Sequence, residues 1–222
     1  MKLIFVRDLN FAKPKSLLFL HKQEYCKLIF FILDMSTEKS NRCQWCLKDD
    51  LYKAYHDNEW GKPLHDDTKL FEMLILEGAQ AGLSWHTILI RRQNYAKAYD
   101  QWDYEKIAQY KQEKVDALLQ DSGIIRNKLK VNASISNAQA FIRVRKEFGT
   151  FDNYIWSFTD GKTIDNKPKT LEDVPATSEL SDTISKDLKK RGFKFVGSTI
   201  CYAYMQAIGI VNDHILDCDF RE

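Results

Sequence analysis

Cysteine and histidine residues gather near the two ends of the chain at spacings that could bind a metal ion. Cys43, Cys46 and His56 lie in one segment, and His214 and Cys218 lie close to the C-terminus. Two thiolates with two imidazoles form the closed tetrahedral set of a structural zinc site, which has no position open for water. We expect His214 and Cys218, four residues apart, on one face of a helical turn. The site would tie the N-terminal loop to the C-terminal segment.

The sequence leaves open which residues complete this set. Either His56 or Cys46 would satisfy zinc beside the other three residues, and spacing alone does not choose between them. Chance scatter of Cys and His is the competing interpretation. The chain has five Cys residues, an odd number, and their metal-ligand spacings favour a reducing compartment over disulfides. We therefore expect a cytoplasmic protein.

A second group of residues centres on one acidic side chain, Glu77, on the apolar side of a predicted helix. A buried acid costs free energy unless it has a partner, and an exposed last-turn position is the ordinary alternative for a Glu. The segment 78–85 has two glycines around small residues and ends in Leu-Ser-Trp, which predicts a tight turn lining a cleft. Aromatic residues crowd the same part of the chain: Trp45, Tyr52, Tyr55, Trp60, Phe71 and Trp85.

Positive charge is concentrated in residues 186–194, which contain five basic side chains and a single acid. Helices are predicted before Gly192 and after Gly197. The glycine turn between them would expose backbone N–H groups at a helix N-terminus, where a phosphate can bind with help from Arg191 and Lys194. A Lys-rich helix end that is simply solvated is the competing interpretation.

The elements that must position these residues are mostly helical. Asp66 and Asp67 can cap a helix that ends near Gly78, and a second helix can run from Ser84 to Ala98. Clean period-2 alternation is nearly absent, and the Gly- and Pro-containing stretch 159–177 is typical of a long surface connection. We expect a compact, all-α domain. Three further helical patterns complete it: 103–110, 113–120 and 127–148.

Composition fits one globular protein with a sizeable core. The chain has 222 residues, of which 44% are hydrophobic and 29% charged, and this excludes a disordered chain or a disulfide scaffold. Lys and Arg total 33 against 31 acidic residues, a formal charge of +2. This balance gives no argument for a nucleic-acid partner, so any polyanion site must come from local segregation of charge.

The first 34 residues require separate treatment. Their apolar runs are interrupted by charged and polar residues, and none approaches the ~20 apolar residues of a membrane span. A signal peptide is an alternative, but no small-residue cleavage site follows the apolar runs. Met35 precedes a short polar leader, so we expect translation to start there, with residues 1–34 an upstream extension and residues 35–222 the functional domain. From Met35 on, the net charge is −1.

Five segments in chain order carry a resemblance to a known family: YKAYHDNEWG (52–61), LEGAQAGLSW (76–85), GIIRN (123–127), KKRGFKFVG (189–197) and VNDH (211–214). They resemble DNA-3-methyladenine glycosylase I, a family of the helix-hairpin-helix glycosylase superfamily. The likeness extends from about Arg42 to Cys218. It implies a bacterial base-excision repair enzyme built as a helical domain with a helix-hairpin-helix element and one structural zinc ion.

The resemblance also implies roles for individual residues. Zinc ligands fall on Cys43, His56, His214 and Cys218, which leaves Cys46 as an extra thiol. The base pocket falls on Trp45, Tyr52, Tyr55, Trp60, Glu77 and Trp85, with Glu77 and Tyr55 as the catalytic pair. The loop that fills the gap left by an extruded base falls on Gln80 and Leu83, and the phosphate-binding hairpin on Arg191, Gly192, Lys194 and Gly197.

The activity implied is hydrolytic removal of 3-methyladenine from alkylated double-stranded DNA, which releases the free base and leaves an abasic site without strand cleavage. Methylation at N3 makes adenine a cationic leaving group, so a carboxylate at Glu77 and aromatic faces at Tyr55 and Trp85 would favour it over neutral adenine. Asn212 stands where many superfamily members carry a catalytic Asp. We expect Asp213 to orient His214 or to cap a helix.

Two other classes of function remain open from the sequence. One is a non-catalytic, zinc-stabilised helical DNA-binding protein, against which the buried acid in an aromatic cluster argues. The other is a binder of small cationic heterocycles, for which the basic hairpin would be incidental. We expect a monomer without membrane association.

Overall fold

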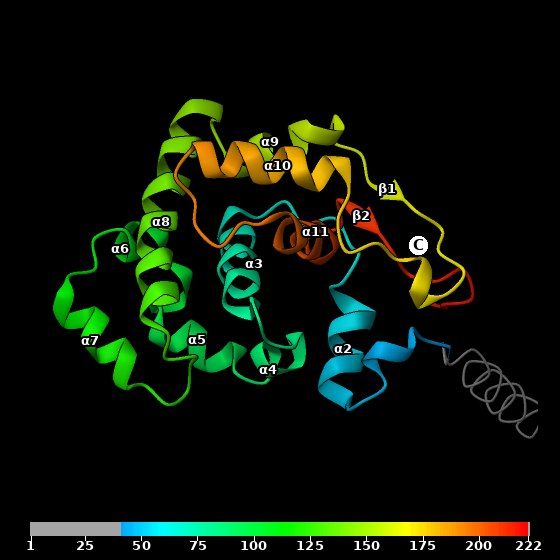
Figure 1. Ribbon diagram of the computed structural model, residues 1–222, viewed down its shortest axis with the longest axis horizontal. Helices are drawn as coiled ribbons and strands as arrows, with labels where there is room; N and C mark the ends of the chain where they lie inside the picture. The colour runs from blue at the N-terminus through cyan, green and yellow to red at the C-terminus, as the bar shows by residue number, and fades with distance from the viewer. Residues whose placement is uncertain (1–40, 222) are drawn as a thin grey trace, which may run out of the picture. The chain divides into compact units, whose positions relative to one another are not determined.

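Helices dominate the computed structural model, which describes residues 41–221 (Figure 1). The predicted extension, residues 1–34, lies outside the described residues. No described helix is both long and apolar enough to cross a bilayer. The elements, in chain order, are η2 (Gln44–Cys46), α2 (Asp50–Asn58), α3 (Asp67–Gln80), α4 (Trp85–Leu89), α5 (Arg92–Ala98), η3 (Asp100–Trp102), α6 (Tyr104–Ile107), α7 (Gln112–Gln120), α8 (Lys128–Phe148), α9 (Phe151–Trp156), η4 (Ser157–Thr159), β1 (Ile164–Asp165), η5 (Leu171–Asp173), α10 (Glu179–Lys190), α11 (Ser198–Ala207) and β2 (Val211–Asn212).

Polar side chains cap the start of several of these helices, among them Asp66, which the sequence predicts as a cap. The Asp66 side chain accepts a hydrogen bond from the backbone N–H of Lys69 at the start of α3. Asn127 caps α8 in the same way, and Ser178 forms a capping box with Ser181 at the start of α10. Each cap satisfies a backbone donor that the first helical turn leaves free. The predicted helical class is therefore confirmed, with β1 and β2 as the strands among the described residues.

Helix α3 forms the centre of the core. Residues 70–79 of this helix are all buried, and the helix packs against α4, α8, α9 and α11. A helix that is covered on every side has no solvent-facing stripe. Glu77 belongs to this covered stretch and therefore lies inside the protein.

The predicted helix from Ser84 to Ala98 is wrong as one element. The chain forms α4, bends at Ile90 and Arg91, and continues as α5. The reason is tertiary: the Arg92 guanidinium donates hydrogen bonds to Glu59 and Glu72, and these contacts fix the direction of α5. The predicted helix 103–110 is likewise shorter, since α6 covers only Tyr104–Ile107.

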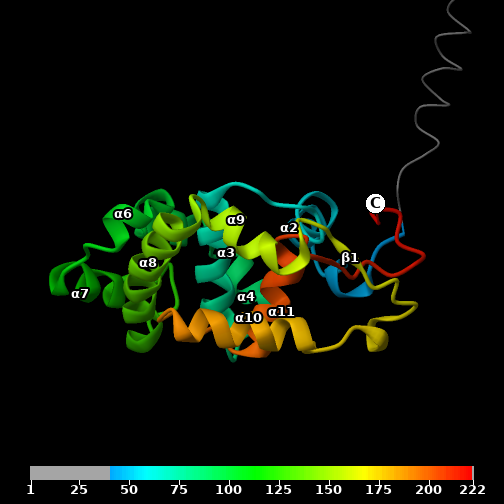
Figure 2. The same ribbon diagram turned by 90° about the horizontal axis from the view of Figure 1, so that it is seen from above.

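The described ends of the chain lie side by side, as Figures 1 and 2 show. The backbone N–H of Asn41 donates to Asp219 Oδ2, and the N–H of Asp219 donates to the Asn41 carbonyl. Strands β1 and β2 pair in parallel beside them, with Ile164 opposite Val211. This pairing anchors the predicted surface connection 159–177, most of which is exposed.

Helices α10 and α11, joined by a turn over residues 191–197, form the predicted helix-hairpin-helix element (Figure 1). Gly192 adopts φ +97°, a conformation that side-chain-bearing residues rarely take. Buried Phe193 and Val196 anchor the turn in the core. We call residues 191–197 the hairpin turn, and residues 81–84, between α3 and α4, the α3–α4 loop.

Candidate active site

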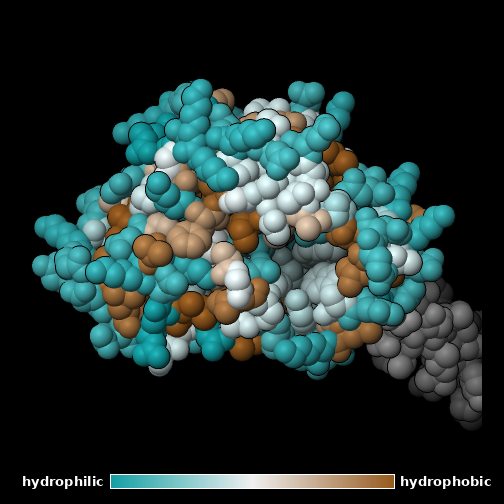
Figure 3. Space-filling model, in the orientation of Figure 1, coloured by the Kyte–Doolittle hydropathy of each residue, from teal (hydrophilic) through white to brown (hydrophobic). Residues whose placement is uncertain are grey.

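A cavity of about 280 Å³ opens where η2, α2, α3, α4 and α11 meet. On the face shown in Figure 3 it is a hollow whose walls have intermediate hydropathy. All six residues predicted for the base pocket line this cavity: Trp45, Tyr52, Tyr55, Trp60, Glu77 and Trp85. Gln80, predicted for the DNA-contacting loop, lines it as well.

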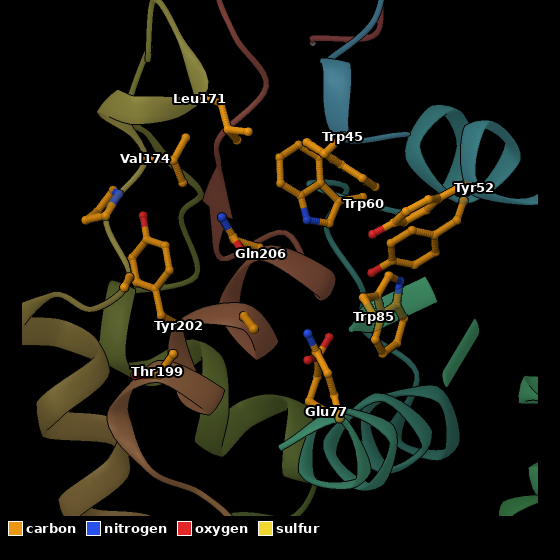
Figure 4. A pocket seen from close by; sticks show the side chains of 15 residues that line it. Trp45, Tyr52, Trp60, Glu77, Trp85, Leu171, Val174, Thr199, Tyr202 and Gln206 are labelled. Carbon is orange, nitrogen blue, oxygen red and sulfur yellow. The ribbon is translucent and has the colours of Figure 1, made fainter. Parts of the chain in front are cut away.

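Glu77 forms the acidic floor of the cavity (Figure 4). Its position near the C-terminal end of α3 leaves the side chain 3% exposed. The Oε2 atom is buried without a hydrogen-bond partner among the described residues. Burial raises the pKa of Glu77 to about 8 because desolvation disfavours the carboxylate. The site thus holds an acceptor that a bound donor would satisfy.

Aromatic rings form one wall of the cavity (Figure 4). Trp45 from η2 packs edge-on against Tyr52 and Trp60, with ring centroids 4.9 Å apart in each pair. Tyr55 lies one turn beyond Tyr52 on α2, and its ring is 5.2 Å from that of Trp85. Ring faces gathered in this way can hold a flat heterocycle by stacking, with added attraction for a cation.

The opposite wall comes from α11, which the sequence analysis did not assign to the pocket. Thr199, Tyr202, Ala203 and Gln206 line the cavity from this helix. Their spacing of three and four residues is the pattern of one helix face, and it is the signal that could have found them. The surface connection also contributes a rim: Leu171, Val174, Pro175 and Ala176.

Asp213 supports this second wall, and the two roles expected for it are wrong. Its buried carboxylate accepts hydrogen bonds of 2.8 Å from the Tyr202 hydroxyl and from Gln206 Nε2, and one of 2.7 Å from Asn166. It neither orients His214 nor caps a helix. These long-range partners, at sequence separations up to 47, fix the direction of two side chains that face the cavity.

Four predicted metal ligands come together in a buried group: Cys43, His56, His214 and Cys218. One ligand atom from each residue lies within 4.8 Å of all the others. Cys218 Sγ is 3.3 Å from His214 Nδ1 and 3.5 Å from His56 Nε2, and Cys43 Sγ is 3.9 Å from His214 Nδ1. The separations of 3.3–3.9 Å are close to the edges of a tetrahedron with metal–ligand bonds of about 2.0–2.3 Å. The group can hold a metal ion.

Neighbouring groups orient both histidines for that role. His214 Nε2 lies 3.0 Å from the Trp60 carbonyl, and His56 Nδ1 lies 2.8 Å from Asp57 Oδ1. Each contact leaves the other ring nitrogen to face the sulfur atoms, as metal-binding histidines require. The pKa of the Cys218 thiol is lowered, first by a hydrogen bond from Cys43 and then by both histidines, which favours a thiolate ligand.

Two details of the metal prediction are resolved by the fold. Cys46 Sγ donates to the Cys43 carbonyl at 3.1 Å and stands outside the four-residue group. His214 and Cys218 do not lie on a helix; they flank a turn after β2, in which the Cys218 N–H donates to the Ile215 carbonyl. The prediction of a helical turn is wrong because the segment pairs with β1 and then reverses direction.

The two predicted DNA-contacting segments lie near the cavity but expose different groups. Leu83 in the α3–α4 loop is 41% exposed, and Gly82 beside it adopts φ +77°. Lys194 is exposed on the hairpin turn, whereas the Arg191 guanidinium pairs with Glu147 and Asp187. Contact of Arg191 with DNA remains a prediction, to which these acidic partners lend no support.

Comparisons with known proteins agree with this architecture. The model of the methyladenine glycosylase family matches residues 45–222. DNA-3-methyladenine glycosylase 1 of Escherichia coli (strain K12) is 50% identical over 177 residues, which cover 80% of this chain and 95% of that protein. A crystal structure of 3-methyladenine DNA glycosylase I, whose sequence is 50% identical, superposes with a TM-score of 0.79. The match covers 81% of this chain and 98% of the chain in that structure.

A further solved structure holds a ligand. It is a Tyr→Phe variant of 3-methyladenine DNA glycosylase I in complex with 3-methyladenine, 33% identical to this chain. Its TM-score is 0.80, and the match covers 82% of this chain and 98% of that one. The extent of the family match and the identity of these relatives lead to one conclusion: the chain belongs to the methyladenine glycosylase family.

Proposed function

We propose that this protein excises 3-methyladenine from alkylated double-stranded DNA by hydrolysis and releases the free base. The observation that carries the proposal is the unpartnered Glu77 carboxyl at the floor of an aromatic cavity. Membership of the methyladenine glycosylase family supports it, as does a relative whose structure contains 3-methyladenine.

The cavity would recognise the base in two ways. The rings of Tyr55 and Trp85 stack on the electron-poor heterocycle, which is worth about 0.5–2 kcal/mol in a desolvated site. Burial keeps the Glu77 carboxyl protonated in the empty cavity, and the positive charge of the methylated base favours its ionisation when that base enters. The resulting carboxylate accepts a hydrogen bond from the exocyclic amine and favours the methylated cation over neutral adenine. A neutral base fails to compensate the cost of this buried charge, and discrimination follows from that difference.

The chemical step requires little from the protein beyond this recognition. The glycosidic C1′–N9 bond breaks, and its electron pair leaves with the base, which neutralises the positive charge that methylation introduced. Water adds to the sugar carbon and loses a proton to solvent, so the products are free 3-methyladenine and an abasic site. Glu77 holds the cationic base in the cavity until the bond breaks, and the aromatic wall keeps the base oriented.

The base must leave the helix before it reaches the cavity, at a cost of a few kcal/mol that is lower for a damaged pair. The hairpin turn would hold backbone phosphates through N–H groups at the start of α11, with Gly192, Gly197 and Lys194 at the contact and Arg191 beside it. Leu83 and Gln80 would occupy the space that the extruded base leaves. The exposed Leu83 and Lys194 side chains support this assignment.

We assign zinc to the four-residue group of Cys43, His56, His214 and Cys218. Two thiolates and two imidazoles suit Zn²⁺, which when bound would supply a cross-link between the chain ends and no reactive water. Tyr55 and Trp60 lie on the segment that this cross-link holds. The group therefore supports the cavity wall and takes no part in bond cleavage.

The remaining assignments concern the state of the protein. The family match over residues 45–222 supports a glycosylase domain at 35–222. We infer a monomer that works in the cytoplasm, where thiols stay reduced. The proposed partners are alkylated duplex DNA and the free base as product.

The direct test incubates the purified full-length protein with duplex DNA treated with a methylating agent, and identifies the released bases by chromatography. We expect 3-methyladenine in the supernatant while 7-methylguanine stays in the DNA. A folded, metal-loaded protein that binds duplex DNA and releases no base would instead support the alternative, a non-catalytic zinc-stabilised DNA-binding protein.

A further inference from the structure

Lys130 on α8 makes two contacts that bracket the end of α3. Its ammonium donates hydrogen bonds to the carbonyls of Ala79 and Ala81, both at 2.7 Å. These carbonyls stand on either side of Gln80, where the last turn of α3 gives way to the α3–α4 loop. Carbonyls at a helix C-terminus lack intrahelical donors, and a cation there is favourable. Lys130 therefore fixes the point from which the loop departs.

Asn137 on the same helix makes a matching pair of contacts with the hairpin turn. Its Oδ1 accepts a 2.7 Å hydrogen bond from the backbone N–H of Lys194, and its Nδ2 donates to the Lys194 carbonyl at 3.0 Å. The Asn137 side chain is 3% exposed. An amide that binds both backbone groups of one residue fixes the position and the orientation of that residue. Asn137 therefore holds the turn at its exposed basic residue.

The spacing of these two residues places both contacts on one face of α8. Seven residues are close to two helical turns, so Lys130 and Asn137 lie about 10 Å apart along the axis. The hairpin turn and α3 also touch directly, since a Cβ atom built on Gly78 would lie 3.4 Å from the Cβ of Phe195. One rigid helix thus contacts both segments that are assigned to DNA.

We propose that Lys130 and Asn137 are positioning residues that set the spacing between the α3–α4 loop and the hairpin turn on duplex DNA. This inference rests on the proposed function. A loop that enters the base stack and a turn that holds phosphates must reach the same duplex together. Excision from a duplex therefore depends on the two contacts, whereas binding of the free base in the cavity does not.

The test compares Lys130→Met, which removes the donor, with Lys130→Arg, which restores a cationic donor. Lys146→Met is the matched control, because Lys146 is an exposed lysine in the last turn of the same helix. Two quantities are measured for each protein: the single-turnover excision rate on a methylated duplex, and the affinity for free 3-methyladenine from tryptophan fluorescence.

We expect Lys130→Met to lower the excision rate about 10- to 100-fold, the scale of a displacement near 1 Å, with the free-base affinity unchanged. Lys130→Arg should recover most of the rate, and Lys146→Met should match the wild type. Asn137→Ala, which removes no charge, should likewise lower the excision rate and leave the free-base affinity unchanged. Equal rates for wild type and Lys130→Met would overturn the inference, as would a parallel loss of free-base affinity.

A direct contact of Lys130 with phosphate would also slow excision, and salt dependence separates the two roles. Loss of one phosphate contact lowers the slope of log K against log salt by about 1. The inference requires an unchanged slope for Lys130→Met, and a reduced slope would overturn it. Failure of the wild type itself to excise any base would refute the proposed function, so the two failures are distinguishable.

Discussion

Glu77 and Trp85 line the same cavity, and each buries one polar atom without a hydrogen-bond partner in the described part of the chain. Glu77 Oε2 offers an acceptor from α3, and Trp85 Nε1 offers a donor from the first residue of α4. An unsatisfied buried group costs about 1–3 kcal/mol. A heterocycle that carries both donors and acceptors can recover part of that cost, so the cavity is prepared for a nucleobase rather than for a purely apolar ligand.

Glu77 should make stability depend on pH in an unusual direction. Its pKa is about 8 in the folded protein and near 4.5 when exposed. Between these values the unfolded chain loses a proton that the folded protein retains, so the free energy of unfolding falls as pH rises from about 4.5 to 8. Glu77→Gln should remove this pH dependence, because glutamine does not titrate. The free energy of unfolding of Glu77→Gln should therefore exceed that of the wild type by an amount that grows with pH to a few kcal/mol. Denaturant titrations at several pH values measure the difference, and a constant difference would contradict the raised pKa.

Removal of the metal should loosen the chain ends without removing any reacting group. A chelator such as EDTA, or the substitution Cys218→Ser, should lower the melting temperature because the buried Cys and His side chains lose their common partner. Added Zn²⁺ should restore the chelated protein but not the variant. Cys46→Ser is the matched control, since Cys46 lies outside the four-residue group. Zinc analysis by mass spectrometry should find one ion per chain in Cys46→Ser. A Cys46→Ser protein that contains no zinc and yet is as stable as the wild type would refute the zinc site.

Leu83 should matter for duplex DNA and not for the folded state. The side chain is 41% exposed, so Leu83→Ala should change the free energy of unfolding by less than about 0.5 kcal/mol. Excision from a methylated duplex should fall severalfold, because Gln80 alone then remains to fill the gap in the base stack. Leu47→Ala, at another exposed leucine, is the control. If Leu83→Ala excises at the wild-type rate, the loop has another role.

Local signals in the sequence predicted the elements on which the site is built. Asp66 and Asn127 begin α3 and α8 because a side-chain oxygen can satisfy a nearby backbone N–H, and this chemistry is visible within four residues. The acidic and aromatic residues of the cavity were also predicted, because they all lie in one segment, residues 45–85, and match the family resemblance.

The orientation of the side chains in the second wall of the cavity could not be predicted in the same way. Tyr202 and Gln206 take their orientation from Asp213, and Asp213 is placed by the pairing of β2 with β1, some 47 residues earlier. The bend between α4 and α5 likewise depends on ion pairs from Arg92 to Glu59 and Glu72. These hydrogen bonds and ion pairs join residues that are far apart in the sequence and meet only after the chain folds. The periodicity of the sequence therefore does not predict them.

The measurement that tests the central claim most directly is the single-turnover rate of 3-methyladenine release by wild type and by Glu77→Gln from the same methylated duplex. Glu77→Gln keeps the shape of the side chain and a carbonyl acceptor but removes the negative charge. We expect the rate to fall about 100-fold or more, on the scale of losing one electrostatic group from a preorganised site, while the melting temperature is retained or raised. A Glu77→Gln protein that releases 3-methyladenine as fast as wild type would contradict the assignment of recognition to this carboxylate.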